Sequence, residues 1–103
     1  MELPVRLAAL HPLLHWAPGG NGYTHQLQID CPKCGPRYRL ILNCSESVAP
    51  GTAPGIWRIT LPGAPGGDGW DGVTLAPSVN NSNHGPRKAC GQHFSIINGE
   101  VVP

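Results

Sequence analysis

Two short segments of the chain each place a pair of metal-binding side chains two residues apart. The first is the Cys-Pro-Lys-Cys segment at residues 31–34, and the second is the Cys-Gly-Gln-His segment at residues 90–93. A tight turn directs both side chains of such a pair toward one point, and cysteine thiolates and neutral histidine are ligands that Zn²⁺ prefers. Together the two pairs predict one tetrahedral structural zinc site, whose ligands are Cys31, Cys34, Cys90 and His93.

Two other residues are alternative zinc ligands. Cys44 could replace His93 and complete an all-cysteine shell, and His84 lies near the second pair in sequence. Cys44 follows a predicted strand, where a cysteine is more often a small core residue. His84 lies between Asn83 and Gly85 in a polar segment that is typical of a surface loop. The spacing therefore favours His93 and leaves the other two residues as alternatives.

Four protein ligands close the coordination shell, which is a feature of structural zinc, whereas catalytic zinc keeps an open position. A zinc deaminase would show His-x-Glu before Pro-Cys-x-x-Cys, and the sequence does not contain that order of motifs. A metal-dependent nuclease in which His84 acts beside Asn81 or Asn83 is an alternative. Because these residues have no predicted strand–helix frame around them, we expect a protein without catalytic activity.

The composition indicates one small domain with a thin core. Of the 103 residues, 14 are Gly and 12 are Pro, and there is one Phe and one Met. A domain of this size buries roughly 60–70% of the surface that its unfolded chain exposes, so its stability is marginal. Structural zinc contributes about 10–16 kcal/mol in small peptides near neutral pH, as much as the net stability of a typical domain. We therefore expect a single zinc-stabilised domain over residues 1–103.

The charge of the chain does not indicate a strongly basic face. Seven Lys and Arg residues and six Asp and Glu residues give a formal net charge of +1. Nucleic-acid-binding modules usually carry a pronounced basic patch. A weaker group of basic residues lies near the two ligand pairs and could contact phosphates or a protein partner. These residues are Lys33, Arg37, Arg39, Arg87 and Lys88.

The three tryptophans are candidates for core or contact residues. Trp57 shares a strand face with Ile59 and Leu61 by alternation, which predicts a core position. Trp16 follows an apolar N-terminal segment, and we expect it to pack there. Trp70 lies among glycines at a predicted loop tip, where it either contacts a partner or packs over a small core.

Alternation of apolar and polar residues predicts a mostly β fold. Strands are expected at residues 23–30, 37–42, 56–61 and 72–76. Residues 93–97 and 100–102 flank Asn98-Gly99, a dipeptide that favours a type I′ turn, and they predict a C-terminal β-hairpin. Since each ligand pair adjoins a strand, the predicted architecture is a small zinc-ribbon-like domain with two knuckles and long Gly/Pro loops.

The first 22 residues are expected to form an N-terminal arm, or a short helix followed by a loop. Four leucines between residues 3 and 14 recur at spacings of three and four, but Pro12 ends any regular helix near His11. The apolar run at 7–14 is too short for a secretory signal, and no run approaches the roughly 18–20 apolar residues of a membrane span. A Cys-x-x-His pair also has no role in a disulfide framework. We therefore expect a cytoplasmic or virion-associated protein that is not secreted.

Three segments in order, Trp57–Thr60, Gly72–Val79 and Cys90–Val101, carry a family resemblance. The chain resembles, over about residues 30–102, an uncharacterised family of small bacterial and phage proteins that is classed as a domain of unknown function. Its most specific parts are the Pro-Ser-Val segment at 77–79 and the Cys-x-x-His-Phe segment at 90–94. The resemblance implies the same four metal ligands and, from the family's frequent phage setting, a small accessory protein. The segments at 62–69 and 80–88 depart from the family in being longer, and Pro103 stands where an aromatic residue often follows.

These features predict a non-enzymatic, zinc-stabilised accessory module that binds a protein partner, either as a virion assembly component or as an inhibitor of a host factor. A nucleic-acid-binding zinc ribbon is the first alternative, and a nuclease centred on His84 is the second. The candidate partner-binding residues are Trp70, Arg37, Arg39, Arg87 and Lys88.

Overall fold

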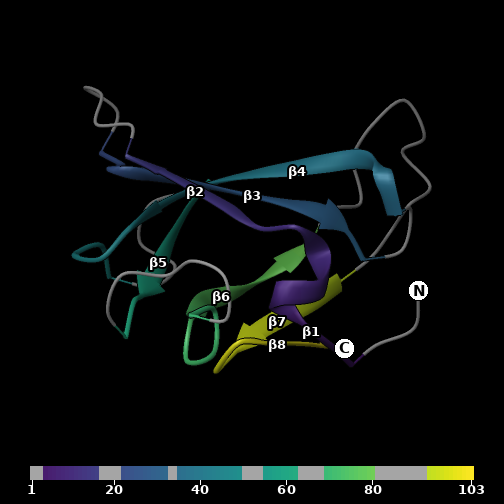
Figure 1. Cartoon of the computed structure of the whole chain (residues 1–103). Coiled ribbons are helices and arrows are strands. Elements are labelled where there is room, and N and C mark those ends of the chain that lie inside the picture. Colours follow the sequence, from purple (N-terminus) through teal and green to yellow (C-terminus); the bar gives the residue numbers. More distant parts are fainter. Residues whose placement is uncertain (1–3, 17–21, 33–34, 50–54, 63–68, 81–92) are drawn as a thin grey trace.

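The computed structural model describes residues 4–16, 22–32, 35–49, 55–62, 69–80 and 93–103. Within these residues the chain forms eight β-strands in one sheet and one short 3-10 helix (Figure 1). The strands are β1 (Val5–Arg6), β2 (Leu13–Trp16), β3 (His25–Cys31), β4 (Gly35–Ser45), β5 (Ile56–Thr60), β6 (Thr74–Asn80), β7 (His93–Ile97) and β8 (Glu100–Val102), and the helix is η1 (Leu7–Leu10). The expectation of a mostly β chain is confirmed.

The strand order in the sheet is β1-β8-β7-β6-β5-β4-β3-β2. Neighbouring strands are antiparallel except β4 and β5, which run parallel from the pair Asn43↔Ile56 to the pair Ser45↔Arg58. A parallel pair requires a crossover connection, and residues 46–55 are the part of the sequence between β4 and β5. The two outermost strands of the sheet, β1 and β2, are consecutive in sequence, and η1 lies between them.

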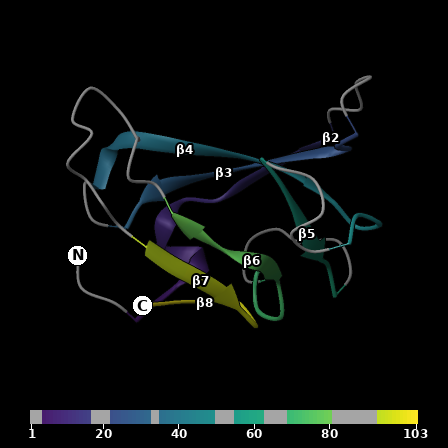
Figure 2. The same ribbon diagram turned by 180° about the vertical axis from the view of Figure 1, so that it is seen from behind.

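The sheet curls over its own inner face. Figures 1 and 2 show β2, β3 and β4 as one layer and β6, β7 and β8 as a second, with β5 turning between the layers. On the remaining side lies η1, and its Leu7 and Leu10 are fully buried. The Leu7 backbone N–H donates a hydrogen bond to the Gly99 carbonyl at 2.7 Å, which fixes η1 to the end of the C-terminal hairpin.

Alternation in the strands places apolar side chains on the inner face. Burying one such side chain contributes about 1.5–3 kcal/mol, so the stability of the sheet depends chiefly on this face. The buried apolar residues are Leu7, Leu10, Leu27, Ile29, Cys31, Leu40, Leu42, Cys44, Ile59, Trp70, Val73, Leu75, Val79, Phe94, Ile96 and Val101.

The predicted C-terminal hairpin is confirmed. Ile97 pairs with Glu100 across the turn, and Asn98 and Gly99 have φ values of 50° and 78°. Positive φ at both central residues is what a type I′ turn requires, and Asn followed by Gly is the sequence that tolerates it at least cost.

The N-terminal segment differs from the expected arm. Its leucine spacing produces only η1, because His11 adopts a left-handed conformation with φ of 50° and ends the helix. The residues on either side form the edge strands β1 and β2. β2 pairs with the next strand, β3, whereas β1 pairs with β8. Pairing over the distance between β1 and β8 leaves no local periodic signal.

Candidate functional site

The sheet topology brings two of the predicted zinc ligands to one edge of the sheet, where "edge" means the side at which strand ends lie and not an outermost strand. Cys31 is the last residue of β3 and His93 is the first residue of β7. Between β3 and β7 the sheet contains three antiparallel strand pairings and one parallel pairing. The two strands therefore run in opposite directions. The end of β3 and the start of β7 therefore lie at the same edge, on the right in Figure 1. Cys34 and Cys90 lie outside the described residues.

Cys31 lies on the inner face and is fully buried. The pairing of β3 with β4 shifts register after Asp30, so that Cys31 pairs with Gly35, which has φ of 78°. A left-handed residue at this point allows the chain to reverse direction within a few residues. The connection that contains the first predicted ligand pair is therefore short, as the Cys-x-x-Cys-Gly spacing indicated.

His93 lies on the outer face of β7, next to the buried Phe94. Its ring atom Nε2 is 2.7 Å from the Ser78 hydroxyl oxygen on β6. Cys31 and His93 thus leave the sheet on opposite faces. An ion shared by both would have to lie at the rim of the sheet, beyond the strand ends.

Among the residues that the structure describes, no three His, Cys, Asp or Glu side chains gather in a metal-binding group. The predicted four-residue site includes two residues outside that part of the chain, Cys34 and Cys90. Zinc coordination by Cys31, Cys34, Cys90 and His93 therefore stays a prediction, and the alternative ligand His84 also lies outside the described residues.

Cys44 is a core residue of β4. Its side chain is fully buried, and its thiol donates a hydrogen bond to the Leu42 carbonyl at 3.1 Å. Burial raises the pKa of the Cys44 thiol to about 12, and a hydrogen bond with the Leu27 backbone offsets this only in part. Cys44 is therefore protonated at neutral pH and has the properties of a small apolar side chain. Zinc binds the thiolate form of cysteine, which Cys44 does not adopt at this pH.

The predicted partner-binding residues do not form one surface in the described part of the chain. Trp70 is only 6% exposed and belongs to the core. Of the two positions expected for Trp70, the structure therefore shows packing in the core and not an exposed position. Arg39 forms an ion pair with Asp30. Arg87, Lys88 and the side chain of Arg37 lie outside what the structure describes.

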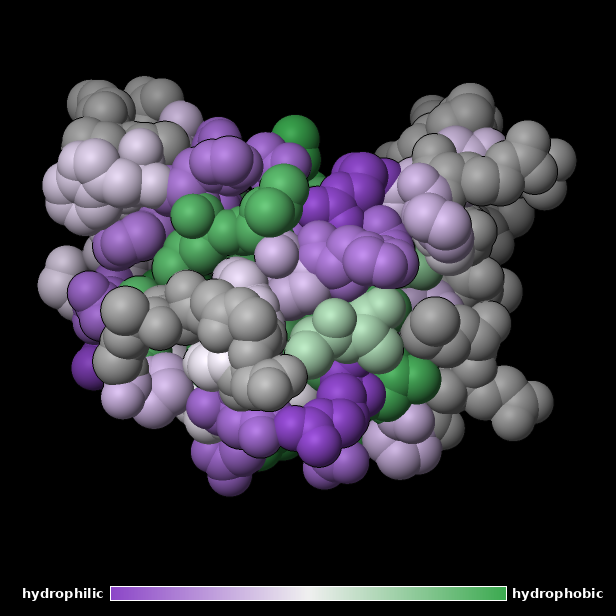
Figure 3. All heavy atoms as spheres, in the orientation of Figure 1, coloured by the Kyte–Doolittle hydropathy of each residue, from purple (hydrophilic) through white to green (hydrophobic). Residues whose placement is uncertain are grey.

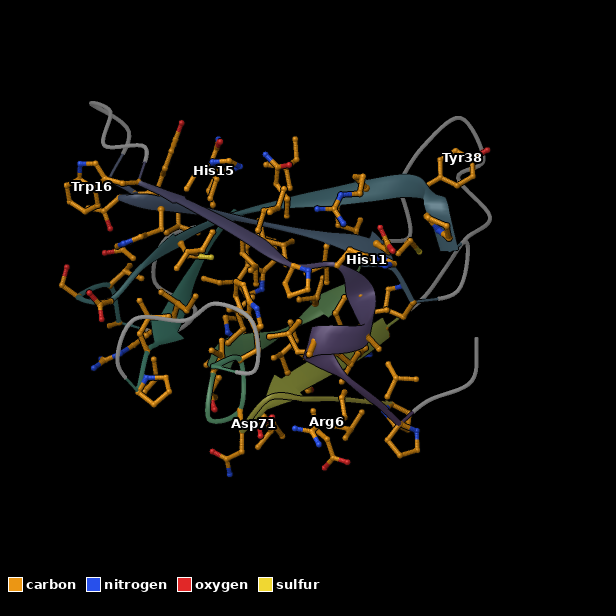
Figure 4. All side chains as sticks on the ribbon, in the orientation of Figure 1. Arg6, His11, His15, Trp16, Tyr38 and Asp71 are labelled. Atoms are coloured by element: carbon orange, nitrogen blue, oxygen red, sulfur yellow. The ribbon has the colours of Figure 1, made fainter. Side chains whose placement is uncertain are left out.

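The other two tryptophans lie in β2 and β5. Trp57 is half-buried and packs against the core, as its alternation with Ile59 predicted. Trp16 is 69% exposed and does not pack into the N-terminal apolar segment. Its ring meets His25 edge to face, with the ring centroids 5.1 Å apart, at the outer end of β2 (Figure 4).

A cluster of charged residues that sequence reasoning missed centres on the buried Asp30. One carboxylate oxygen is 2.6 Å from His11 Nδ1, and the other accepts a hydrogen bond from Arg39 at 2.8 Å. The Arg39 guanidinium also donates to the backbone carbonyls of Leu10 and Gln28. Figure 4 shows His11 at the junction between η1 and β2. The cluster therefore fastens the N-terminal segment to β3 and β4.

The pKa of Asp30 results from opposing effects. Burial alone raises the pKa of this carboxyl group, but the hydrogen bonds from His11 and Arg39, together with their positive charges, outweigh burial and lower the pKa below its ordinary value of 3.8. Asp30 is therefore ionised at neutral pH. The polar position between Ile29 and Cys31 in β3 was the available signal, but it did not reveal which cations approach it.

An exposed apolar row on the outer face was also missed. Leu13 on β2 is opposite Gln28 on β3, which is opposite Ile41 on β4. Leu13 is 51% exposed and Ile41 is 58% exposed. Figure 3 shows hydrophobic side chains gathered along this part of the molecule, where β2 and its neighbouring strands lie.

Comparisons with protein-family models, with curated proteins and with solved structures found no match. In the described residues, none of the helical structure is long and apolar enough to cross a membrane.

Proposed function

We propose that this chain is a non-enzymatic, zinc-stabilised accessory module that binds a protein partner. The observation that carries partner binding is the exposed row of Leu13, Gln28 and Ile41 across β2, β3 and β4. Leu13 and Ile41 lie on either side of Gln28 in this row. Large apolar side chains that are exposed on the same face mark an interaction site more often than a single exposed side chain does.

The surroundings of the row support a protein as its ligand. The next row on the same face is formed by His15, Gln26 and Asn43, and the Gln26 amide donates to the Asn43 side-chain oxygen at 3.1 Å. Exposed apolar side chains beside a polar, hydrogen-bonding row have the mixed composition that is usual at a protein–protein interface. A nucleic-acid ligand has less support, because Arg39 on this face is already paired with Asp30.

The role that we propose for zinc is to hold the ends of β3 and β7 together. Cys31 and His93 lie at the same edge of the sheet, and the segments that contain Cys34 and Cys90 join that edge. The resemblance to small bacterial and phage proteins supports an accessory role, in virion assembly or in the inhibition of a host factor. A cytoplasmic or virion-associated location would accompany that role.

The zinc part of the proposal is tested by metal analysis and thermal melting. The purified protein should contain one equivalent of zinc, and Cys34→Ser or Cys90→Ser should unfold it, because loss of a thiolate removes folding free energy. His84→Ala should leave the melting temperature near that of the parent. An unchanged melting temperature in both cysteine variants would rule out structural zinc at this site.

The partner part is tested by copurification after nuclease treatment. A stoichiometric protein partner should be lost in the double variant Leu13→Lys/Ile41→Lys, because two charges then interrupt the exposed row. Ile97→Lys is the matched control, since Ile97 is also an exposed apolar strand residue but lies on β7. Equal loss of the partner in the control, or retention in the double variant, would place the interface elsewhere. Binding that is abolished by the nuclease would instead favour the nucleic-acid alternative.

A further inference from the structure

The turn of the C-terminal hairpin consists of Asn98 and Gly99, and Asn-Gly is the dipeptide in which asparagine deamidates most readily. Asn98 is exposed, whereas Gly99 is buried against the segment before β6. Figures 1 and 2 both show the turn between β7 and β8 beside that segment. The reactive dipeptide therefore lies where the hairpin contacts the rest of the fold.

Deamidation of Asn-Gly uses the backbone nitrogen of the glycine. This nitrogen loses its proton and attacks Cγ of the asparagine, so that an N–Cγ bond forms and the bond from Cγ to the side-chain nitrogen breaks. Ammonia leaves with the proton, and water then opens the resulting succinimide ring to give isoaspartate or aspartate. Water is the only co-reactant, and the net change replaces an amide by a carboxylate. Glycine favours ring closure because it has no side chain to hinder it.

Hydrogen bonds of the folded protein oppose this attack. The Gly99 N–H donates to the Val73 carbonyl at 2.8 Å, so the nitrogen keeps its proton and faces an acceptor on another segment. The Asn98 N–H donates to Thr74 Oγ1 at 3.0 Å, and the Gly99 carbonyl accepts from the Leu7 N–H at 2.7 Å. The peptide group that would have to rotate is therefore held on both sides.

The conformation of the turn also keeps the reacting atoms apart. Both turn residues have positive φ, as a type I′ turn requires. In that turn, the mirror image of type I, ψ of the first central residue is about +30°, which turns the Gly99 nitrogen away from the Asn98 side chain. Rotation toward Cγ is hindered because Gly99 lies against a neighbouring backbone, where an added Cβ would be only 2.7 Å from the Asp71 Cα.

We propose that Asn98 is a latent modification site, which does not deamidate while the hairpin contacts Val73 and Thr74 and which reacts when the hairpin opens locally. The isoaspartate product has an additional methylene group in its backbone and cannot re-form the two-residue turn. The hydrogen bond that fixes Leu7 of η1 to Gly99 is then lost. Deamidation thus makes a transient opening permanent, and this inference depends neither on zinc nor on a partner.

The first test compares deamidation of the folded chain with deamidation in guanidinium chloride, in the same mildly alkaline buffer, by mass spectrometry of tryptic peptides. Peptides 7–33 and 89–103 each contain one asparagine, Asn21 and Asn98, and each asparagine precedes a glycine. Asn21 is therefore the internal reference for the unfolded chain, where both should react at similar rates. Without denaturant, Asn98 should react at least about tenfold more slowly, as expected if the hairpin is open less than about a tenth of the time. Equal rates of Asn98 in the two conditions would overturn the inference.

The second test weakens the contact of the turn. Thr74→Val removes the acceptor of the Asn98 N–H and should speed deamidation of the folded protein about 2- to 10-fold, the effect of one lost hydrogen bond on the opening equilibrium. Thr60→Val is the matched control, because Thr60 is exposed and pairs with Thr74 from β5. It should react at the parent rate. An unchanged rate in Thr74→Val, or an equal acceleration in Thr60→Val, would show that the turn does not control the reaction.

The third test concerns the product. The isoaspartate form is separated chromatographically from aged protein, and Asn98→Asp is its control, since it has the same new carboxylate on an ordinary backbone and Asp-Gly favours the same turn. The Leu7 amide should lose its protection against hydrogen exchange in the isoaspartate form and keep it in Asn98→Asp. Equal protection in the two would contradict a permanent opening.

Discussion

Asp30 is a buried anion in a chain with few charges, and its two side-chain partners come from different parts of the sequence. Arg39 lies on the neighbouring strand β4, whereas His11 lies in the connection between η1 and β2. A buried charge with its partners adds little net stability, because the cost of desolvation offsets the attraction, but a buried charge that loses its partners is strongly destabilising. The cluster therefore matters more for holding the N-terminal segment in place than for adding net stability.

Asp30→Asn should lower the free energy of unfolding at pH 7 by about 1.5–3 kcal/mol, since hydrogen bonds to a charged group contribute that much. Urea denaturation measures this difference. Asp71→Asn is the matched control, because Asp71 forms its ion pair with Arg6 at an exposed site (Figure 4). Exposed pairs contribute about 0–1 kcal/mol. Equal losses in the two variants would show that burial of Asp30 does not matter.

The stability difference between the parent and the same variant should also depend on pH. The pKa of Asp30 is lower in the folded protein than its ordinary value of 3.8, so below about pH 4 the unfolded chain binds a proton first. The stabilisation by the Asp30 carboxylate is complete above that pH and is lost as the pH falls through the folded pKa. The stability difference between the parent and Asp30→Asn should therefore shrink as the pH falls below about 4. A difference at pH 2.5 that is as large as the difference at pH 5 would contradict the lowered pKa.

At the scale of elements, the C-terminal hairpin is held against the segment before β6 by a close backbone approach. The Gly99 backbone N–H donates to the Val73 carbonyl at 2.8 Å. A Cβ atom on Gly99 would lie 2.7 Å from the Asp71 Cα and from the Trp70 carbonyl oxygen. The glycine is therefore required both for its left-handed conformation and for the space that it leaves to a neighbouring backbone.

Two glycines with the same φ of 78° allow the cost of the left-handed conformation to be measured apart from the cost of the close backbone approach. Gly99→Ala meets the backbone of Trp70 and Asp71, whereas for Gly55→Ala no heavy atom of the described residues lies within 4 Å of the added Cβ. Gly55→Ala should cost about 1–2 kcal/mol for the left-handed conformation alone. Gly99→Ala should cost about 1–3 kcal/mol more, because the crowded backbone must shift. Chemical denaturation measures both, and equal costs would mean that the close approach relaxes freely.

Elements with local signals were predictable from the sequence. The hairpin followed from Asn98-Gly99, and β3, β5 and β7 followed from alternation with only small errors at their ends. β4 extends to Ser45, beyond the predicted end at Leu42, because its last residues pair with β5 in parallel. The edge strand β1 had no local signal, since its partner β8 lies at the other end of the chain.

The candidate site likewise has one part that was predictable from the sequence and one part that was not. The ligand spacing of Cys31 and Cys34 is a local pattern and could be read directly. The contacts of His11 with Asp30 and of Ser78 with His93 join residues from separate elements, and no periodicity of one element can predict them.

At the scale of the whole molecule, the first and last strands are mutually dependent. β1 pairs with β8 from Val5↔Val101 to Arg6↔Glu100, and Val101 is fully buried beside the η1 leucines in the same core. Removal of residues 100–103 should therefore abolish the folded state, because it removes the partner of β1 together with a core residue. Removal of Pro103 alone should leave the thermal melting curve unchanged. A truncated chain that still melts cooperatively near the parent temperature would show that β1 and β8 are dispensable.

The pairing of β1 with β8 also determines when the sheet can be completed during synthesis. η1 is translated well before the residues that hold it, Gly99 and the strand after it. A nascent chain must therefore carry Leu7 and Leu10 uncovered until the C-terminal hairpin has been made, and this is the interval in which chaperones would protect it from aggregation.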